Sequence, residues 1–186
     1  MLPFCEWLAS TPYSIALIES LYMYPLIESI HVWTLGVFFG MATVLDLRLL
    51  GVALRSVPVS DLLERLQPWT LISFAIMITT GMLLFYAIPV RTYQSVWFRA
   101  KMVMLVLAGI NVLIFHKGIY TSVENWKLSE SIPRAARIAG AVSLLLWSSI
   151  IISGRFIAYN WFDCDRQPQP PIINLLAGCV VDEAGE

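Results

Sequence analysis

Four long runs of apolar residues dominate the chain, and each is long enough to cross a bilayer as a helix. A hydrocarbon core of about 30 Å requires about 20 residues in helical conformation. The four runs cover residues 25–47, 68–88, 101–117 with some extension, and 135–159. We therefore expect an all-α integral membrane protein built as a four-helix bundle.

Prolines punctuate these runs at positions that fit helix boundaries. Pro25 and Pro68 suit the first turn of a helix, Pro89 closes the second run, and Pro133 precedes the fourth. The segment 11–24 is too short and too interrupted to span a bilayer by itself. It is expected to form either an N-terminal interfacial helix or a bent extension of the first span.

The composition supports a lipid environment. Of the 186 residues, 58% are hydrophobic and 13% are charged, whereas charged residues make up about a quarter of an ordinary soluble protein. The net charge of −1 and the lack of any Lys/Arg block longer than a pair exclude a nucleic-acid footprint. The expected partners are the bilayer and either further copies of the chain or other membrane subunits. We divide the chain into an N-terminal segment (1–24), the bundle (25–159) and an external C-terminal tail (160–186).

The distribution of Lys and Arg predicts an orientation. Seven lie beside the loops that follow the first and third runs, five lie on the opposite side, and the first twenty residues contain none. Because the more positive side usually faces the cytoplasm, we expect both termini outside it. The seven are Arg48, Arg55, Arg65, Lys117, Lys127, Arg134 and Arg137, and the five are Arg91, Arg99, Lys101, Arg155 and Arg166.

Each run carries one face of polar or small residues at helical spacing. Ionisable groups within a span are costly, so they are expected to face the interior of the bundle and to serve a function. The four faces are Glu28, His31, Leu35, Phe38, Ala42 and Asp46; Thr70, Ser73, Met77 and Thr80; Lys101, Leu105, Gly109, Val112 and His116; and Arg137, Gly140, Leu144, Ser148, Ile151 and Arg155.

The chain contains two histidines, and both fall in or at the edge of a span. Imidazole is a common axial ligand of haem iron, and a bundle interior is a common cofactor site, so His31 and His116 predict b-type haem. At 1.5 Å per residue the two histidines differ in depth by roughly 16 Å. A single iron therefore does not take both, and two haems at different depths fit better.

Other residues are candidates for completing such sites. Met82 and Met104 lie near the depth of His31, and Met41 lies near that of His116; a thioether is an accepted sixth ligand of haem iron. Arg155 is placed to meet either a haem propionate or Glu28, and Arg137 is its counterpart on the inner side.

The alternative to these assignments is that the same residues have purely structural roles. A membrane histidine is often satisfied by hydrogen bonds to neighbouring helices, and buried methionines more often pack than ligate. Glu28 and His31 have the Glu-x-x-His spacing of a metal site, but a di-iron centre repeats this motif on another helix and this chain does not. Asp46 and Arg48 are expected to form a boundary ion pair or to anchor the helix end.

Three cysteines fall on the predicted external side. Cys5, Cys164 and Cys179 are in a position where oxidation is permitted, so a disulfide between two of them is expected. The sequence does not select the pair.

Several stretches resemble an uncharacterised family of small bacterial inner-membrane proteins with four predicted spans. They are "YPLIESIHVWTLG", "VLDLRLLGVALR", "LQPWTLISFAIMITTGMLLF", "FRAKMVMLVLAGINVLIFH" and "PRAARIAGAVSLLLWSSIIISGRFIAY". The resemblance covers most of residues 20–159 and implies a bacterial inner (cytoplasmic) membrane, but no activity. The architecture is also similar to cytochrome b561 by analogy of fold, although that type supplies a histidine pair to each haem.

The leading hypothesis is therefore a b-haem membrane protein for electron transfer or small-molecule redox chemistry. His31 is the expected outer iron ligand and His116 the expected inner one. Two other functions stay open: a non-enzymatic subunit or scaffold of a larger complex, and a small transporter or proton relay built on Glu28, His31, Lys101 and Arg155.

Overall fold

The computed structural model describes residues 1–119 and 132–179, and every extended element among them is a helix. Lys127, which contributes to the predicted orientation, lies outside the described residues. The four long helices are α3 (Met23–Leu50), α4 (Val59–Ala87), α6 (Val96–Ile114), which a π-helical turn η1 (Phe115–Ile119) extends, and α7 (Arg134–Ala158). The short helices are α1 (Leu2–Ala9), α2 (Pro12–Glu19), α5 (Pro89–Tyr93) and α8 (Pro171–Ala177).

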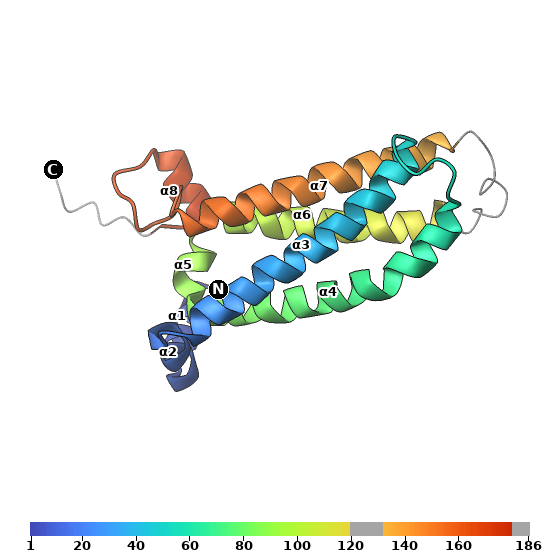
Figure 1. The fold of residues 1–186 in the computed structure, drawn as a ribbon. Helices are drawn as coiled ribbons and strands as arrows, with labels where there is room; N and C mark the ends of the chain where they lie inside the picture. Colours follow the sequence, from blue (N-terminus) through green and yellow to red (C-terminus); the bar gives the residue numbers. More distant parts are fainter. Residues whose placement is uncertain (120–131, 180–186) are drawn as a thin grey trace.

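The predicted four-span bundle is confirmed. All four long helices are long and apolar enough to cross a bilayer, and they run side by side in Figure 1. The short helices gather at one end, called here the short-helix end, and the loop between α3 and α4 lies at the other, called the loop end. Large apolar side chains cover much of the outer surface, which is the arrangement that a lipid environment requires.

Residues of α4 correct the expected start of the second span. Pro68 lies inside α4 rather than in its first turn, because the helix begins nine residues earlier, at Val59. The added turns bury Val59 and Leu63 against Leu49 and other residues of a core cluster at the loop end. Proline is tolerated within membrane helices where neighbouring groups satisfy the freed backbone.

The loop end is closed by a chain reversal after α3. Gly51 ends α3 in the left-handed conformation with a φ of 74°, and its N–H bonds back to the Arg48 carbonyl at 3.0 Å. Arg48 is 4% exposed and donates from Nε to the Val57 carbonyl at 2.7 Å. Arg48 therefore anchors the loop, as one of the two sequence interpretations expected, and it forms no ion pair with Asp46 within the described chain.

The N-terminal segment forms two separate short helices rather than a bent extension of α3. α2 docks on the end of α4, where the Ser14 hydroxyl donates to the Tyr86 carbonyl at 2.8 Å. The hydroxyls of Thr11 and Tyr86 also share a hydrogen bond of 2.7 Å. Cys5 of α1 is buried and free, and burial raises the pKa of its thiol.

The C-terminal segment folds back onto the start of α6. Cys164 and Cys179 form a disulfide, which is one of the pairings the sequence left open. Ser95 pairs with Asp163 in an isolated β-bridge, and the Val96 N–H bonds to the Phe162 carbonyl at 3.1 Å. These contacts join residues 160–179 to the short-helix end of the bundle.

Arg99 connects α6 to α8 within this segment. Its Nη1 donates to the Leu176 carbonyl at 2.7 Å, and its guanidinium lies 4.8 Å from the centre of the Tyr93 ring. A cation placed at the C-terminal carbonyls of a helix is favourable because those groups carry partial negative charge. Residues 160–179 therefore form a cap on one end of the bundle.

Candidate functional site

The inward faces of the four helices decide which polar residues meet. On α4 the predicted face is confirmed, since Ser73, Met77 and Thr80 are all buried. On α6 the buried and half-buried side runs instead through Met104, Ala108, Asn111 and Phe115, and Gly109, Val112 and His116 are exposed. On α7 the buried positions include Ala136, Ala139, Gly140, Trp147, Ile150 and Ser153, whereas Arg137 and Arg155 are exposed. The predicted faces of α6 and α7 therefore overlap the observed ones only in part: Gly140 is buried as expected, whereas the charged ends of the α7 face are exposed.

His31 is held against α4 by a hydrogen bond. Its Nδ1 lies 3.0 Å from the Thr80 hydroxyl oxygen. That hydroxyl directs its own proton toward the carbonyls of Ile76 at 2.8 Å and Met77 at 3.1 Å. The hydroxyl oxygen is thus placed to accept from the imidazole, which puts a proton on Nδ1 and leaves Nε2 outside this hydrogen bond.

Gly81 fixes the distance between His31 and α4. A Cβ atom placed on Gly81 would lie 3.3 Å from Cε1 of the imidazole. This is tighter than most Cβ contacts, so any larger side chain at this position would push the ring away from Thr80. The histidine thus packs directly on the helix backbone.

Lys101 brings a positive charge to the same part of the bundle. It extends from α6 toward α7, where its Nζ would lie 3.7 Å from a Cβ placed on Gly154. It also interacts electrostatically with His31. Within the described ranges no acidic side chain forms an ion pair with Lys101. The site therefore brings an imidazole from α3 and an amine from α6 into the same part of the bundle.

Aromatic side chains close this site toward the middle of the bundle. The Phe38 and Trp147 rings meet edge to face with centroids 4.5 Å apart, and the Phe38 and Phe74 centroids are 5.4 Å apart. Met77 and Ala108 are buried in the same cluster, and Met104 packs against it. We call Phe38, Phe74 and Trp147 the aromatic layer.

The structure does not bring His116 into contact with this site. His116 is exposed in η1 near the loop end, and its Nδ1 lies 3.2 Å from the Val112 carbonyl. His31 belongs to the other half of the bundle, because Thr80 and Gly81 lie near the far end of α4. The two histidines therefore lie in different halves of the bundle, as the predicted difference in depth implies.

The other predicted site residues are also dispersed. Met82 is 67% exposed, and Met41 accepts a hydrogen bond from the Thr70 hydroxyl at 3.7 Å. Arg155 is exposed and donates to the Tyr159 hydroxyl at 2.8 Å. Of the predicted sixth ligands, Met104 alone packs into the core of the bundle.

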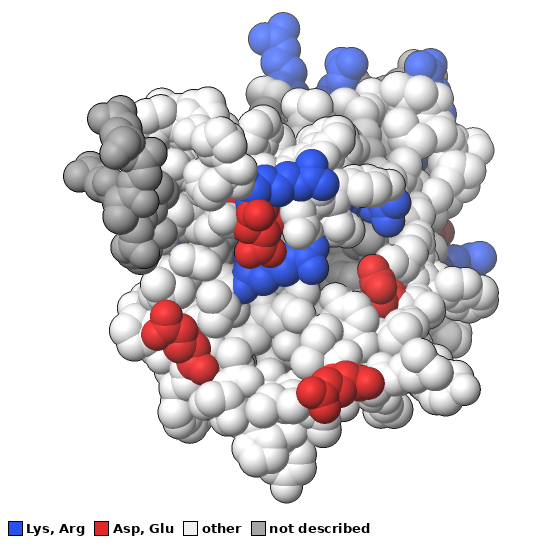
Figure 2. All heavy atoms as spheres, turned by 90° about the vertical axis from the view of Figure 1, so that its left-hand side faces the viewer, with Lys and Arg blue, Asp and Glu red and all other residues white. Residues whose placement is uncertain are grey.

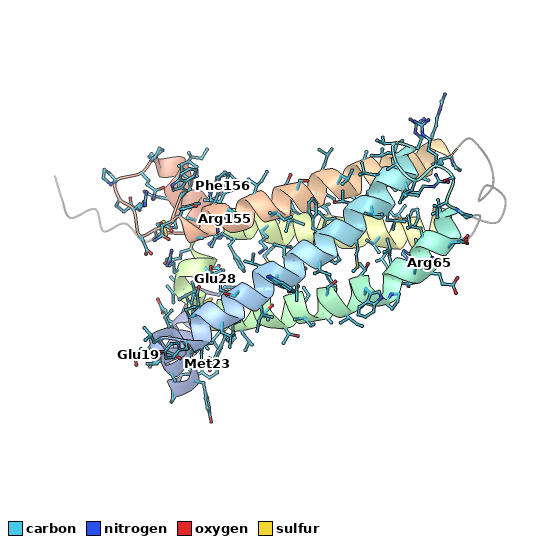
Figure 3. All side chains as sticks on the ribbon, in the orientation of Figure 1. Glu19, Met23, Glu28, Arg65, Arg155 and Phe156 are labelled. Atoms are coloured by element: carbon cyan, nitrogen blue, oxygen red, sulfur yellow. A yellow bond between two sulfur atoms is a disulfide. The ribbon has the colours of Figure 1, made fainter. Side chains whose placement is uncertain are left out.

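Glu28 lies in the same half of the molecule as Arg155, toward the short-helix end (Figure 3). It is exposed and makes no ion pair with a described residue. No group of three or more His, Cys, Asp or Glu side chains that could hold a metal occurs in the described part of the chain. Figure 2 shows acidic and basic side chains interspersed on this end, without a large patch of one sign.

The two glycines of the site were not found from the sequence. Gly81 and Gly154 each lie beneath a polar side chain from another helix. The sequence does indicate these positions, because each glycine directly follows a hydroxyl-bearing residue, Thr80 in one helix and Ser153 in the other. Small residues in membrane helices commonly mark close approach.

The fit of haem differs between the two histidines. At His31 the imidazole is oriented by the bond between Nδ1 and Thr80, which is how an axial ligand is usually held, and the Lys101 amine is a group that would suit a propionate. At His116 the ring lies on an exposed face, so the described residues do not form an enclosed site there. The residues therefore fit one haem better than two.

The fold and the site define a four-span helical membrane protein with a polar cluster inside one half of its bundle. A family model matches residues 7–160, and the chain belongs to that family, which is described as a family of unknown function, DUF6644. Comparisons with curated proteins and with solved structures gave no match.

Proposed function

We propose that the protein binds one haem b through His31 and serves in electron transfer or small-molecule redox chemistry. The observation that carries the proposal is the imidazole of His31, which Thr80 and Gly81 hold with Nε2 available. An axial histidine is normally oriented in this way, by a hydrogen bond from its other nitrogen. When bound, the haem supplies one-electron exchange at its iron.

The remaining residues of the site have supporting roles in this proposal. Thr80 orients the ligand, and Lys101 supplies positive charge for a propionate. Met104 is the candidate sixth ligand from the core, and Arg155 is a candidate propionate partner at the short-helix end. The aromatic layer excludes water from the inner side of the site.

Visible absorption of the protein, purified in detergent after expression with haem supply, tests the proposal. We expect a Soret band in the wild-type protein and its loss in His31→Ala with the helical circular dichroism unchanged. His116→Ala is the matched control and is expected to keep the band, because that residue lies outside the site. A protein without a Soret band, or a band that His31→Ala leaves intact, would contradict the proposal.

A second candidate function is a proton relay, and the proximity of Lys101 to His31 favours it. The free Nε2 of a neutral imidazole accepts a proton, and a neighbouring amine exchanges one. Reconstituted vesicles with an imposed membrane potential test this function. Proton flux that Lys101→Met abolishes, in a protein without a chromophore, would favour the relay over the haem protein.

A third candidate is a membrane subunit that packs against another copy of itself. Gly36 and Gly40 are exposed on α3, nothing lies within 4 Å of a Cβ placed on either, and Val32, Trp33 and Val37 line a shallow groove beside them. Glycines four residues apart allow close helix approach in membranes. A dimer in lipid nanodiscs that Gly36→Leu dissociates would favour this function.

A further inference from the structure

A second polar cluster lies on the other side of the aromatic layer, where Asp46 of α3 meets α7. Asp46 is 5% exposed. A Cβ placed on Gly140 of α7 would lie 3.1 Å from the Asp46 carbonyl oxygen and 3.1 Å from the Leu49 Cβ. Glycine at position 140 thus lets the two helices approach closely enough to enclose the aspartate.

The carboxyl group of Asp46 is only partly satisfied inside this contact. It accepts a hydrogen bond from the Ser143 side chain of α7. Its Oδ2 is buried and has no hydrogen-bond partner, and the same is true of the Thr43 hydroxyl one turn earlier on α3. An ionised carboxylate buried without full compensation is strongly unfavourable, so a group in this position binds a counter-charge or a proton.

The Lys and Arg residues that the structure describes do not supply that charge. Arg48 directs its Nε to the Val57 carbonyl, and Arg137 of α7 is exposed. The charged residues at the start of α4 and those of η1 are likewise exposed; they are Asp61, Glu64, Arg65, His116 and Lys117. Among the described residues, none forms an ion pair with Asp46.

A metal cation is also disfavoured by the surroundings. Metal ions of the hard type take six or more oxygen ligands, several of them carboxylates. Asp46 supplies one carboxylate, and the polar residues beside it, Thr43 and Ser143, supply only hydroxyls. The described chain holds no cluster of acidic residues or histidines around it. A single proton satisfies the carboxyl group without any further ligand.

We propose that Asp46 is a proton-binding site of the bundle, which exchanges its proton with water at the loop end. The carboxylate takes up one proton to become the neutral acid and releases it again, without any other reactant. Asp46 lies four residues before the end of α3, which corresponds to about 6 Å along the helix axis. The aromatic layer separates it from His31, so the site does not depend on the proposed haem.

Infrared spectroscopy of the full-length protein in nanodiscs tests this inference, because a protonated carboxyl has its own C=O stretching band. We expect a band at pH 6 that Asp46→Asn removes and that the control Asp61→Asn retains, since Asp61 is exposed. The band is expected to persist in His31→Ala. It is also expected to persist when Na⁺ replaces choline as the cation of the buffer.

A second variant keeps the inference testable if Asp46→Asn does not fold. Ser143→Ala retains the carboxyl group and removes the donor that favours its ionised form. We expect the band to move to higher frequency and the proton affinity to increase about tenfold, as loss of a hydrogen bond to a charged group predicts. No band at pH 6 in the wild type, a band that Asp46→Asn preserves, or loss of the band on adding Na⁺ would overturn the proposal.

Discussion

The orientation of His31 depends on one neighbouring hydroxyl. Thr80 is the only side chain that bonds to its ring in the described structure, and the backbone of α4 at Gly81 supports the same ring from the side. Thr79, the preceding residue, is exposed and bonds only to its own helix, through the Ala75 carbonyl at 2.9 Å. The two threonines therefore form a natural pair for comparison.

Thr80→Val is expected to destabilise the bundle by about 0.5–1 kcal/mol, the usual value of a side-chain hydrogen bond between membrane helices. The valine retains the volume and removes the acceptor of the imidazole N–H. Thermal unfolding in a mild detergent measures the effect, with Thr79→Val as the control. Equal stability of the two variants would show that the hydrogen bond does not hold the ring.

Asp163 gives the short-helix end a dependence on pH. It is 2% exposed, and burial, followed by the charge of Asp165, raises the pKa of its carboxyl. The folded chain thus binds this proton more tightly than the unfolded chain, in which aspartate titrates near pH 4. The contribution of the Asp163 carboxyl to the free energy of unfolding is therefore greatest below about pH 4, and it declines as the pH rises through the raised pKa.

Asp163→Asn is therefore expected to raise the melting temperature at pH 7 by about 2–4 °C, the shift that 1 kcal/mol produces in a chain of this size. The amide oxygen retains the acceptor for the Asp165 N–H, and the difference from wild type should vanish near pH 4. Calorimetry between pH 4 and 7 measures it. Asp61→Asn, which changes an exposed aspartate at the start of α4 near the opposite end of the bundle, is the control expected to give no such rise.

At the residue scale, the sequence showed which side chains carry chemistry but not which of them are buried. It grouped His31 and Lys101 with Glu28 and Arg155, because ionisable groups stand out in apolar spans; His31 and Lys101 interact electrostatically in the structure, and Glu28 and Arg155 are exposed. It also selected His116 and Met82, which are exposed. Exposure depends on the rotation of each helix about its axis, and a polar face two or three residues wide does not fix that rotation.

At the scale of elements, the crossing of α3 and α7 depends on Gly140. The Gly140 position leaves no room for a side chain against the α3 backbone at Asp46. Gly109 on α6 offers a contrast, since nothing lies within 4 Å of a Cβ placed there. A side chain is thus costly at one glycine and free of steric contact at the other.

Gly140→Leu is expected to destabilise the bundle by about 1–3 kcal/mol, as overpacking of a core does. Gly109→Leu is expected to leave the stability unchanged within about 0.5 kcal/mol, because an exposed substitution has a small effect. Equilibrium unfolding in mixed micelles measures both. A Gly140→Leu protein as stable as the Gly109→Leu protein would show that α3 and α7 do not pack as described.

Helix boundaries were predictable where the hydrophobic run itself ends and not where tertiary packing extends the helix. The first and fourth spans agree with α3 and α7 within three residues at each end. The second span begins nine residues before Pro68, because residues 59–67 are amphipathic and pack against the loop-end core. Their charged positions concealed them in a search for continuous apolar residues.

At the scale of the whole molecule, the disulfide provides a test of orientation. Cys164 and Cys179 bond at the short-helix end, and disulfides persist in oxidising compartments. We therefore expect this end to face outward from the cytoplasm. After reduction with a membrane-impermeant phosphine, a membrane-impermeant maleimide should label these two cysteines in intact cells.

Ser56→Cys is the matched control for this labelling experiment. Ser56 is exposed in the loop between α3 and α4, at the opposite end of the bundle. It should react only after the membrane is opened, and Cys5 should stay unlabelled because it is buried. Labelling of Ser56→Cys in intact cells would reverse the predicted orientation.

The aromatic layer has a consequence for how the two halves of the molecule communicate. Phe38, Phe74 and Trp147 belong to three different helices and occupy the cross-section between His31 and Asp46. A continuous chain of water molecules has no path through such packed rings without their displacement. We therefore expect any influence of one half on the other to travel as a shift of helices or as an electric field rather than along a file of water.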